Sequence, residues 1–310
     1  MRTPRIAITG VTGFVGRHLV EAARAAKVEV VGITLHPTNE DQKLDQQLNA
    51  KFSADLTNEF PEIGEVDAVI HLAGLSAVGP SFTQPQRYIS DNSAMVTHLG
   101  EAMLERQGRA PRIVGISSGA VYAQGVLEAL TEEAAVASSS PYVVSKLLVE
   151  HQYNYYSARG LDVVVARPFN HIGPGQSLGF LLPDLVASLL NLREEGEVLS
   201  VGNLNTSRDY TDVRDVAAAY LHLALTDRPL ASLYNIASGR SLLGWEILAM
   251  AANALGLSVP PTSTDPHRMR ATDISRVTGD ARALNVAIGW EPSIRIEQSV
   301  HDYVRDLRAN

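Results

Sequence analysis

The stretch GVTGFVG, residues 10–16, decides the fold. Its glycines follow the spacing Gly10-x-x-Gly13-x-x-Gly16, between an apolar run, RIAIT (residues 5–9), and a helix-forming segment, RHLVEAARAAK. A strand, a glycine turn and a helix in this order predict the first βα unit of a dinucleotide-binding fold. Glycines let the backbone approach a pyrophosphate at the helix N-terminus, where N–H groups and the helix dipole favour an anion. The alternative is a tight turn whose glycines serve packing alone.

The pattern beyond this turn alternates between buried strands and helices. Strand-like runs occur at residues 28–34, 66–74, 112–116 and 161–166, and helical patterns at 84–107 and 142–159. Such alternation predicts an α/β fold with a doubly wound parallel sheet. After about residue 168 the alternation is lost, although residues 213–225 and 233–237 look like a helix and a strand that rejoin the sheet. We therefore expect a dinucleotide-binding domain at 1–168, rejoined by about 205–240, and a smaller C-terminal α/β substrate lobe at 169–204 and 241–310.

The end of the second predicted strand bears on the choice of cofactor. Sites that prefer NAD usually place a carboxylate there, on the ribose hydroxyls. Here the strand runs into Thr34, Leu35 and His36, and no carboxylate precedes Glu40. This favours NADP(H), without excluding NAD(H). No arginine closely follows the strand, so His36 is the nearest candidate for a 2′-phosphate contact; a surface histidine is the alternative.

Two further runs have the features of nucleotide contacts. Residues 52–56 are predicted as a short strand ending in Asp55, which could bind the adenine amino group or simply cap a helix or turn. The strand at 66–74 ends in small residues, which would let a cofactor lie against the strand end. His71 on this strand is predicted to be a packed histidine rather than a catalyst.

Candidate catalytic residues lie in the middle of the chain. Tyr142 and Lys146 are four residues apart at the start of a predicted helix, so both side chains lie on one face. A lysine ammonium favours the phenolate form of a nearby tyrosine, which can then exchange a proton with a carbonyl or alcohol oxygen. Ser117 and Ser118 follow the strand at 112–116, where such sheets bind ligands. A polar turn is the alternative for these serines.

The composition excludes several classes of protein. The chain has 310 residues, 45% hydrophobic and 19% charged, which is typical of a globular protein with a sizeable core. A net charge of −8 argues against nucleic-acid binding. The lack of cysteine excludes disulfides and cysteine-ligated zinc, and we predict no metal site. No apolar run approaches the roughly 20 residues of a membrane helix, so we expect a cytoplasmic protein without a membrane partner.

The motifs together resemble those of the extended short-chain dehydrogenase/reductase family. They occur in family order along nearly the whole chain: TGVTGFVG, Asp55-Leu56, HLAG, SSGAVY, YVVSK, RPFN, RDYTDVRDV and the segment around Arg270. The resemblance implies a Rossmann domain, a smaller lobe that binds a nucleotide-sugar, and a homodimer formed through helices 84–107 and 142–159.

Within the family, RPFNHIGPGQ and GNLNTSRDYTDVRDV are most similar to the segments of GDP-4-keto-6-deoxy-mannose reductases and related sugar nucleotide reductases. This implies NADP(H)-dependent reduction of the 4-keto group of a GDP-4-keto-6-deoxy sugar, as in formation of GDP-D-rhamnose. The family's 4,6-dehydratases have Thr in place of Ser118 and Glu in place of Ala120, which argues against dehydration. A nucleotide-sugar 4-epimerase and a dTDP-4-keto-6-deoxy sugar reductase remain alternatives.

The resemblance assigns roles residue by residue. The catalytic residues are Ser118, Tyr142 and Lys146. The cofactor-binding residues are Gly10, Thr12, Gly13, Phe14, Val15, Gly16, His36, Asp55, Leu56, Leu72, Ala73, Gly74, Ser117, Tyr142, Lys146 and Pro168. The substrate-binding residues are Ser76, Ser81, Ser118, Asn170, Arg208 and Arg270. In this scheme Lys146 also lowers the pKa of Tyr142 and holds the nicotinamide ribose.

Overall fold

A parallel sheet of seven strands forms the centre of the computed structural model, which describes residues 2–35, 42–123, 125, 128–194, 196–228, 230–266 and 276–309. The strand order is β10-β6-β5-β4-β1-β2-β3, and all neighbours are parallel. The order reverses between β1 and β4, as in a Rossmann fold. The strands are β1 (Arg5–Thr9), β2 (Glu29–Thr34), β3 (Ala50–Ser53), β4 (Ala68–His71), β5 (Arg112–Ile116), β6 (Val163–Pro168) and β10 (Leu233–Ile236).

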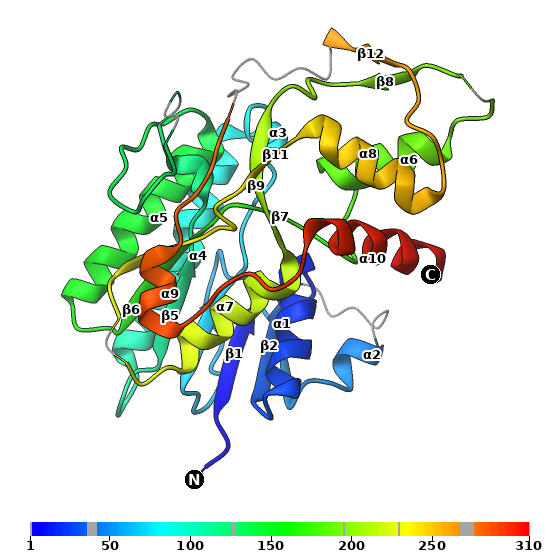
Figure 1. Cartoon of the computed structure of the whole chain (residues 1–310). Helices are drawn as coiled ribbons and strands as arrows, with labels where there is room; N and C mark the ends of the chain where they lie inside the picture. The colour runs from blue at the N-terminus through cyan, green and yellow to red at the C-terminus, as the bar shows by residue number, and fades with distance from the viewer. Residues whose placement is uncertain are drawn as a thin grey trace.

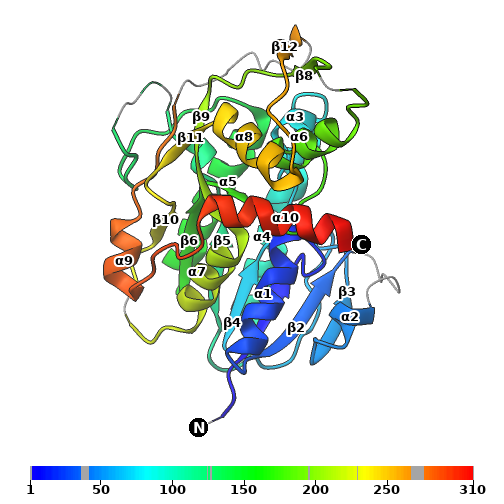
Figure 2. The same cartoon turned by 45° about the vertical axis from the view of Figure 1, so that its right-hand side comes forward.

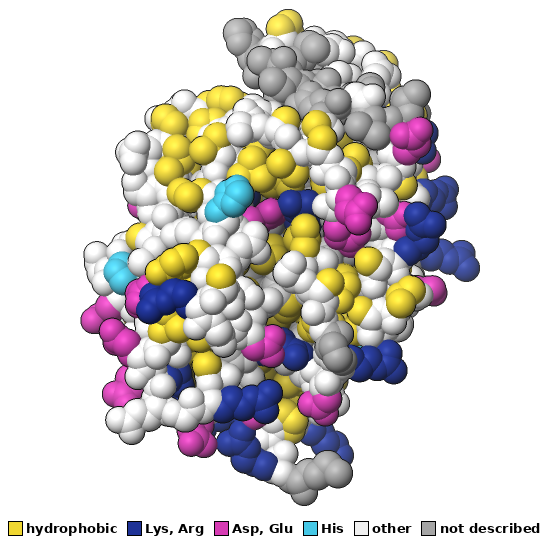
Figure 3. All heavy atoms as spheres, turned by 90° about the vertical axis from the view of Figure 1, so that its left-hand side faces the viewer, with side chains coloured by type: hydrophobic (Ala, Val, Ile, Leu, Met, Phe, Trp, Pro, Cys, Tyr) yellow, Lys and Arg dark blue, Asp and Glu magenta, His cyan; other side chains and the backbone are white. Residues whose placement is uncertain are grey.

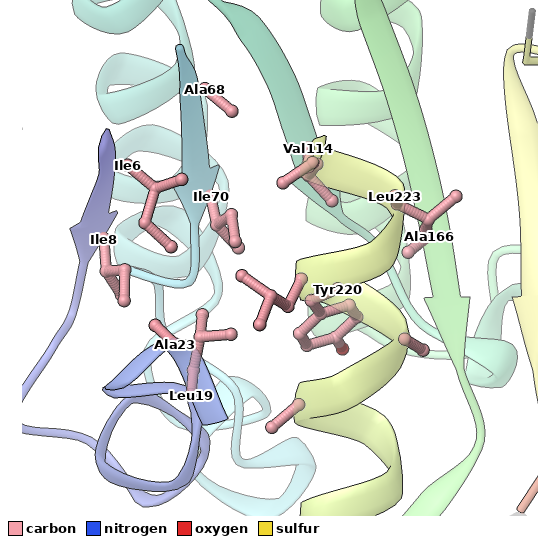
Figure 4. Packing of buried hydrophobic residues seen from close by; sticks show 14 of the residues in the cluster. Ile6, Ile8, Leu19, Ala23, Ala68, Ile70, Val114, Ala166, Tyr220 and Leu223 are labelled. Atoms are coloured by element: carbon pink, nitrogen blue, oxygen red, sulfur yellow. The ribbon is translucent and has the colours of Figure 1, made fainter. Parts of the chain in front are cut away.

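Helices cover both faces of this sheet, which explains why its strands are apolar almost throughout. Helices α1 (Phe14–Ala25) and α7 (Val213–Leu225) pack on one face, and α4 (Pro85–Glu105) and α5 (Pro141–Ala158) pack on the other (Figures 1 and 2). On the first face, Ile6 and Ile70 from the strands share a core with Leu19 of α1, and Leu223 of α7 lies beside Ala166 of β6 in the same core (Figure 4). Neighbouring Ala7 belongs to the core on the opposite face, as expected for alternating side chains.

The rest of the chain forms a smaller lobe above the carboxyl ends of the strands (Figure 1). Its three-stranded sheet has the order β11-β9-β7, and a separate pair joins β8 and β12. Three helices share a hydrophobic core with these strands. The elements are β7 (Asn170–Ile172), α6 (Leu181–Leu190), β8 (Leu199–Val201), β9 (Ser207–Asp212), β11 (Ser241–Leu243), α8 (Gly244–Leu255), β12 (Thr262–Thr264) and α10 (Ile296–Ala309).

Four short elements complete the fold: α2 (Gln42–Asp45), α3 (Val78–Ser81), the 3-10 turn η1 (Gly119–Val121) and α9 (Arg282–Ile288). Helix α9 packs on the main domain, where Leu284 and Trp290 join the core beside α7. The sequence had placed this segment in the lobe. Conversely, β9 belongs to the lobe sheet, so the chain returns to the main domain at α7 rather than near residue 205.

One predicted strand is shorter than expected. Strand β3 ends at Ser53, and Asp55 lies in the turn that follows. The reason is local: the Asp55 carboxylate accepts hydrogen bonds from the backbone N–H (2.9 Å) and hydroxyl (2.7 Å) of Thr57, which turns the chain away from the sheet.

The surface shown in Figure 3 mixes basic, acidic and hydrophobic side chains, without a field of one charge sign across that face. Among the described residues, no helix is long and apolar enough to cross a membrane. Within the same residues, no three His, Cys, Asp or Glu side chains are grouped closely enough to hold a metal ion.

Candidate active site

A cleft of about 1500 Å³ separates the main domain from the lobe, at the carboxyl ends of the strands. This is where open α/β sheets bind ligands, at the point where the strand order reverses. The cleft is lined by almost all of the predicted site residues: Gly10, Thr12, Gly13, Phe14, Val15, Gly16, Asp55, Leu56, Leu72, Ala73, Gly74, Ser76, Ser117, Ser118, Tyr142, Lys146, Pro168, Asn170 and Arg208.

The glycine turn has a shape that fits a dinucleotide. Gly10 adopts a positive φ of 65°, which side chains other than glycine rarely tolerate. A Cβ atom on Gly16 would lie 2.5 Å from the Gly10 carbonyl oxygen, so the turn and α1 pack with no space for a side chain. Gly13 is the N-cap residue of α1, so no side chain caps the helix, and the first helical turn has no acidic residue. No carboxylate of that turn therefore offsets the positive end of the helix dipole, which faces the cleft. A diphosphate group is stabilised by such a helix N-terminus.

We expect Gly16→Ala to weaken NADPH binding at least about tenfold and to destabilise the fold by about 1–3 kcal/mol, because the new methyl group must displace the turn. Fluorescence titration with NADPH and urea unfolding would measure the two effects. Gly79→Ala is the control, since a Cβ there meets no atom within 4 Å. Unchanged NADPH affinity in Gly16→Ala would contradict the role of the turn.

The sequence places the adenosine end of the cofactor beside the ends of β2 and β3. Asp55 and Leu56 line the cleft there, but the Asp55 carboxylate holds the turn described above, which was the alternative interpretation of this residue. Thr34 ends β2, and its hydroxyl lies 3.2 Å from the hydroxyl of Thr12 in the glycine turn. His36 lies outside the described residues.

Ser118, Tyr142 and Lys146 come together at the centre of the cleft. Ser118 follows β5 and caps η1, whereas Tyr142 and Lys146 lie one turn apart at the start of α5. Ser140 begins α5, because its hydroxyl accepts a hydrogen bond from the Val143 N–H (3.2 Å). The Lys146 ammonium donates to the Ile116 carbonyl (2.9 Å) and lies 5.9 Å from the Tyr142 ring centre.

Burial is the largest cause of the pKa shifts of Tyr142 and Lys146. It raises the pKa of Tyr142 above its ordinary value, partly offset by a hydrogen bond with Ser118. The sequence predicted that Lys146 would lower this pKa, but the shift is upward, because burial of the phenolate is its largest cause. Burial also lowers the pKa of Lys146 to about 8, against the opposing effect of Glu150. At neutral pH Tyr142 is therefore a phenol and Lys146 is mostly an ammonium, which suits proton donation.

We expect turnover in the reducing direction to fall as the pH rises through about 8. Lys146 loses its charge there, since its folded-state pKa is lowered to about 8. A phenolate formed at Tyr142 would then lose its neighbouring cation. The measurement is the pH profile of kcat, with Lys146→Met, which lacks the titrating ammonium, as the control without this limb. A kcat that stays constant from pH 7 to 9.5 would contradict the assignment.

His71, at the end of β4, is neutral and structural. Burial, followed by the charge of Lys146, lowers its pKa to about 3. The Thr9 hydroxyl accepts from the Ala73 N–H (3.0 Å) and lies 2.9 Å from His71 Nδ1, so it can donate its own proton to the ring. This geometry agrees with the packed histidine that the sequence predicted.

A buried ion pair beneath Lys146 was not predicted from the sequence. Glu150 lies one turn after Lys146, and its carboxylate binds both Nε (2.8 Å) and Nη2 (2.7 Å) of Arg167 on β6. Ser117 lines the cleft, but its hydroxyl donates to the same carboxylate. The four-residue spacing from Lys146 to Glu150 was a visible signal; the partner on β6 was not.

The lobe contributes two arginines to the cleft. Arg208 on β9 donates to the Ser207 carbonyl (2.9 Å) and lines the cleft as predicted. Arg276 lines it as well, held beside β9 by a bridge between residues 207 and 276. Nothing in the sequence signalled Arg276, since this pairing joins segments far apart in the chain. Arg270 lies outside the described residues.

The two predicted serines near α3 differ in placement. Ser76 lines the cleft. Ser81 is fully buried, is not among the lining residues, and its hydroxyl donates to the Val78 carbonyl (2.6 Å) within its own helical turn. The structure therefore does not bring Ser81 to a substrate.

The fold and this site define an NAD(P)-dependent enzyme of the extended short-chain dehydrogenase/reductase type. Residues 6–237 match the model of the NAD dependent epimerase/dehydratase family, and the chain belongs to that family.

Its relatives include reductases and epimerases. The chain is 35% identical to GDP-6-deoxy-D-mannose reductase of Pseudomonas aeruginosa, over 98% of this chain and 97% of that protein. It is 27% identical to UDP-glucose 4-epimerase of Lacticaseibacillus casei, over 93% and 92% of the two chains. A solved structure, RMD from Pseudomonas aeruginosa complexed with NADPH, is 32% identical and superposes with a TM-score of 0.82 over 99% of each chain. A putative epimerase from Burkholderia cenocepacia is 31% identical, with a TM-score of 0.86 over 99% of each chain.

Proposed function

We propose that this protein is an NADP(H)-dependent reductase of the 4-keto group of a GDP-4-keto-6-deoxy sugar, of the kind that forms GDP-D-rhamnose. The observation that carries the proposal is that Ser118, Tyr142 and Lys146 line one cleft, with the Lys146 ammonium 5.9 Å from the centre of the Tyr142 ring. Reduction of a ketone needs an acid at the oxygen, and this site supplies one at neutral pH. The similarity to a GDP-6-deoxy-D-mannose reductase over nearly the whole chain supports the choice of substrate.

In the proposed mechanism, the glycine turn at residues 10–16 would hold NADPH, which would provide the hydride for the carbonyl carbon. Ser118 donates a hydrogen bond to the 4-keto oxygen and fixes its position. Tyr142 gives its phenolic proton to this oxygen as the alcohol forms. Lys146, anchored on the Ile116 carbonyl, stabilises the phenolate left behind.

The remaining contacts of the substrate lie toward the lobe. Asn170, at the start of β7, lines the cleft close to the sugar in this scheme. Arg208 and Arg276 line the same cleft and would bind the diphosphate, since guanidinium groups form charge-assisted bonds to phosphate. Ala120 occupies the position where dehydratases of the family have Glu, and it also lines the cleft. The proposal therefore includes no elimination of water.

The second candidate is a nucleotide-sugar 4-epimerase, because UDP-glucose 4-epimerases are also among the relatives and the same three residues would serve. Mixing the protein with NADPH and GDP-4-keto-6-deoxy-mannose separates the two. A reductase consumes NADPH in proportion to product, whereas an epimerase causes no net loss of NADPH absorbance. A panel of GDP-, dTDP- and UDP-sugars in a thermal-shift assay tests the nucleotide, since a ligand at about 100 times its Kd stabilises the fold by roughly 2.7 kcal/mol.

The proposal includes a homodimer formed through α4 and α5 in the cytoplasm. These helices pack on each other, and their outer surface leaves Val144, Leu147 and Leu148 partly exposed and Tyr155 54% exposed. Apolar side chains at the same seam in a second copy would cover them. The cytoplasmic location is in keeping with a cysteine-free chain. Light scattering of Leu147→Glu against the unaltered protein tests the dimer: a dimer in both would reject this interface.

A further inference from the structure

A buried carboxylate on β9 ties two loops to the lobe sheet. The side chain of Asp209 is fully buried, and one of its oxygens accepts hydrogen bonds from the backbone N–H (2.8 Å) and the hydroxyl (2.6 Å) of Ser238. The other oxygen accepts from the backbone N–H groups of Gly239 (3.0 Å) and Gly279 (3.0 Å). A carboxylate removed from water is costly unless such donors satisfy it. Asp209 therefore fixes residues 238–239 and residue 279 to the same strand.

Both loops lead to Arg276, which lines the cleft. Gly279 lies three residues after Arg276, and the bridge between Ser207 and Arg276 holds this segment along β9. The other loop runs from residue 239 into β11, which lies beside β9 (Figure 1). The hydroxyl of Ser241, the first residue of β11, accepts a hydrogen bond from Arg276 Nε (3.2 Å). The Asp209 carboxylate thus anchors both segments that hold this guanidinium group.

The same strand carries Arg208 to the cleft. Arg208 and Asp209 are successive residues of β9, so their side chains leave opposite faces of the strand. Arg208 is among the residues that line the cleft, and Asp209 is not. In the pairing with β11, Leu242 lies opposite Arg208 and Ser241 lies opposite Asp209. The carboxylate therefore holds β9 from behind, next to the residue that faces the cleft.

We propose that Asp209 is a positioning residue for substrate: its carboxylate sets the relative placement of Arg208 and Arg276, so that both guanidinium groups reach the diphosphate of one nucleotide-sugar. Charge-assisted hydrogen bonds to phosphate depend on the geometry of the donors, and two cations on separate segments must be held in register to share one ligand. The inference deepens the proposed function and rests on its use of a nucleotide-sugar, but it is independent of whether the sugar is reduced or epimerised.

Asp209→Asn tests the inference with little change of size. Each carboxylate oxygen accepts two hydrogen bonds, so in either orientation the new amide NH2 group faces two donors. We expect GDP binding, measured by calorimetry, to weaken about 10- to 100-fold, the loss typical of one contact with a charged group. NADPH binding should stay within about twofold. With GDP-4-keto-6-deoxy-mannose, KM should rise by a similar factor while kcat stays within about threefold.

Asp215→Asn is the matched control. Asp215 on α7 is also buried, and its carboxylate accepts from the N–H (3.0 Å) and hydroxyl (2.8 Å) of Ser293 and from the Ile294 N–H (2.9 Å). None of these three residues lines the cleft. Asp215→Asn should therefore lower the urea midpoint of unfolding about as much as Asp209→Asn, without changing GDP affinity or KM.

A milder variant covers the case in which Asp209→Asn does not fold. Ser238→Ala removes one of the four donors and keeps the carboxylate. It should weaken GDP binding about threefold or more, again without effect on NADPH. If the unaltered protein binds no GDP, then UDP and dTDP replace it as probes, and a failure to bind all three would reject the inference together with the arginine subsite.

Two further results would overturn the inference. Unchanged GDP affinity in folded Asp209→Asn would mean that the arginines are placed without this carboxylate. Equal loss of GDP and NADPH affinity, or the same loss of GDP affinity in Asp215→Asn, would mean that Asp209 serves stability alone. Failure of the reductase proposal would look different: GDP affinity would follow Asp209 as expected, while no NADPH would be consumed with GDP-4-keto-6-deoxy-mannose.

Discussion

Tyr142→Phe should lower kcat of the proposed reduction by about 10²- to 10⁴-fold, the usual contribution of a positioned proton donor. The change removes one oxygen atom from a phenol that burial keeps protonated. The ring remains, so packing against Tyr88 and Val143 in the small cluster beside the cleft is preserved. NADPH affinity should therefore stay within about threefold, which separates a loss of chemistry from a loss of binding.

Tyr88→Phe is the matched control for this experiment. Tyr88 lies in the same cluster as Tyr142, but its hydroxyl donates to the Ala77 carbonyl (2.7 Å). Its removal should cost about 1 kcal/mol of stability and leave kcat nearly unchanged. Steady-state and single-turnover rates at saturating NADPH are the measurements. Full activity in Tyr142→Phe would reject the proton-transfer role.

Glu150→Gln should reduce the free energy of unfolding by about 3 kcal/mol, because it leaves the buried charge of Arg167 without its counterion. Burial by itself would lower the pKa of Arg167, and the hydrogen bonds and charge of Glu150 more than reverse this. The same substitution removes the charge that raises the pKa of Lys146. The high-pH limb of kcat should therefore move to lower pH, an effect that lost stability alone would not produce.

The control for Glu150 is an exposed ion pair. Glu65 lies 3.5 Å from Arg2, and its side chain is 90% exposed. Glu65→Gln should change stability by less than about 0.5 kcal/mol. Urea unfolding at pH 7 measures both variants, and the double change Glu150→Met with Arg167→Met should recover much of the loss. If Glu150→Gln were as mild as Glu65→Gln, the buried pair would not support the site.

The local parts of the site were predictable from sequence. The glycine turn, the hydroxyls after β5 and the pair on α5 are each set by residues adjacent in the chain. Parallel strands bring their carboxyl ends to one edge, so the fold class implied that these pieces converge. The return of β10 to the main sheet followed from the same strand pattern.

Tertiary pairing set the parts that the sequence did not reveal. Arg276 reaches the cleft through a bridge to residue 207, and Glu150 on α5 pairs with Arg167 on β6. Neither contact follows from spacing. The predicted direction of the Tyr142 pKa shift was wrong, because a charge pair can be inferred from sequence whereas the depth of burial cannot. Desolvation decides this shift.

The late arrival of β10 has a consequence for the nascent chain on the ribosome. Its residues 233–236 pair with β6, whose last residue is Pro168. Until β10 is synthesised, β6 is the open edge of an apolar six-stranded sheet. At about 5–20 residues per second, that edge stays uncovered for several seconds. An uncovered edge strand can pair with other chains, so we expect slower translation of residues 169–232 to increase aggregation, and a chaperone that shields β6 to reduce it.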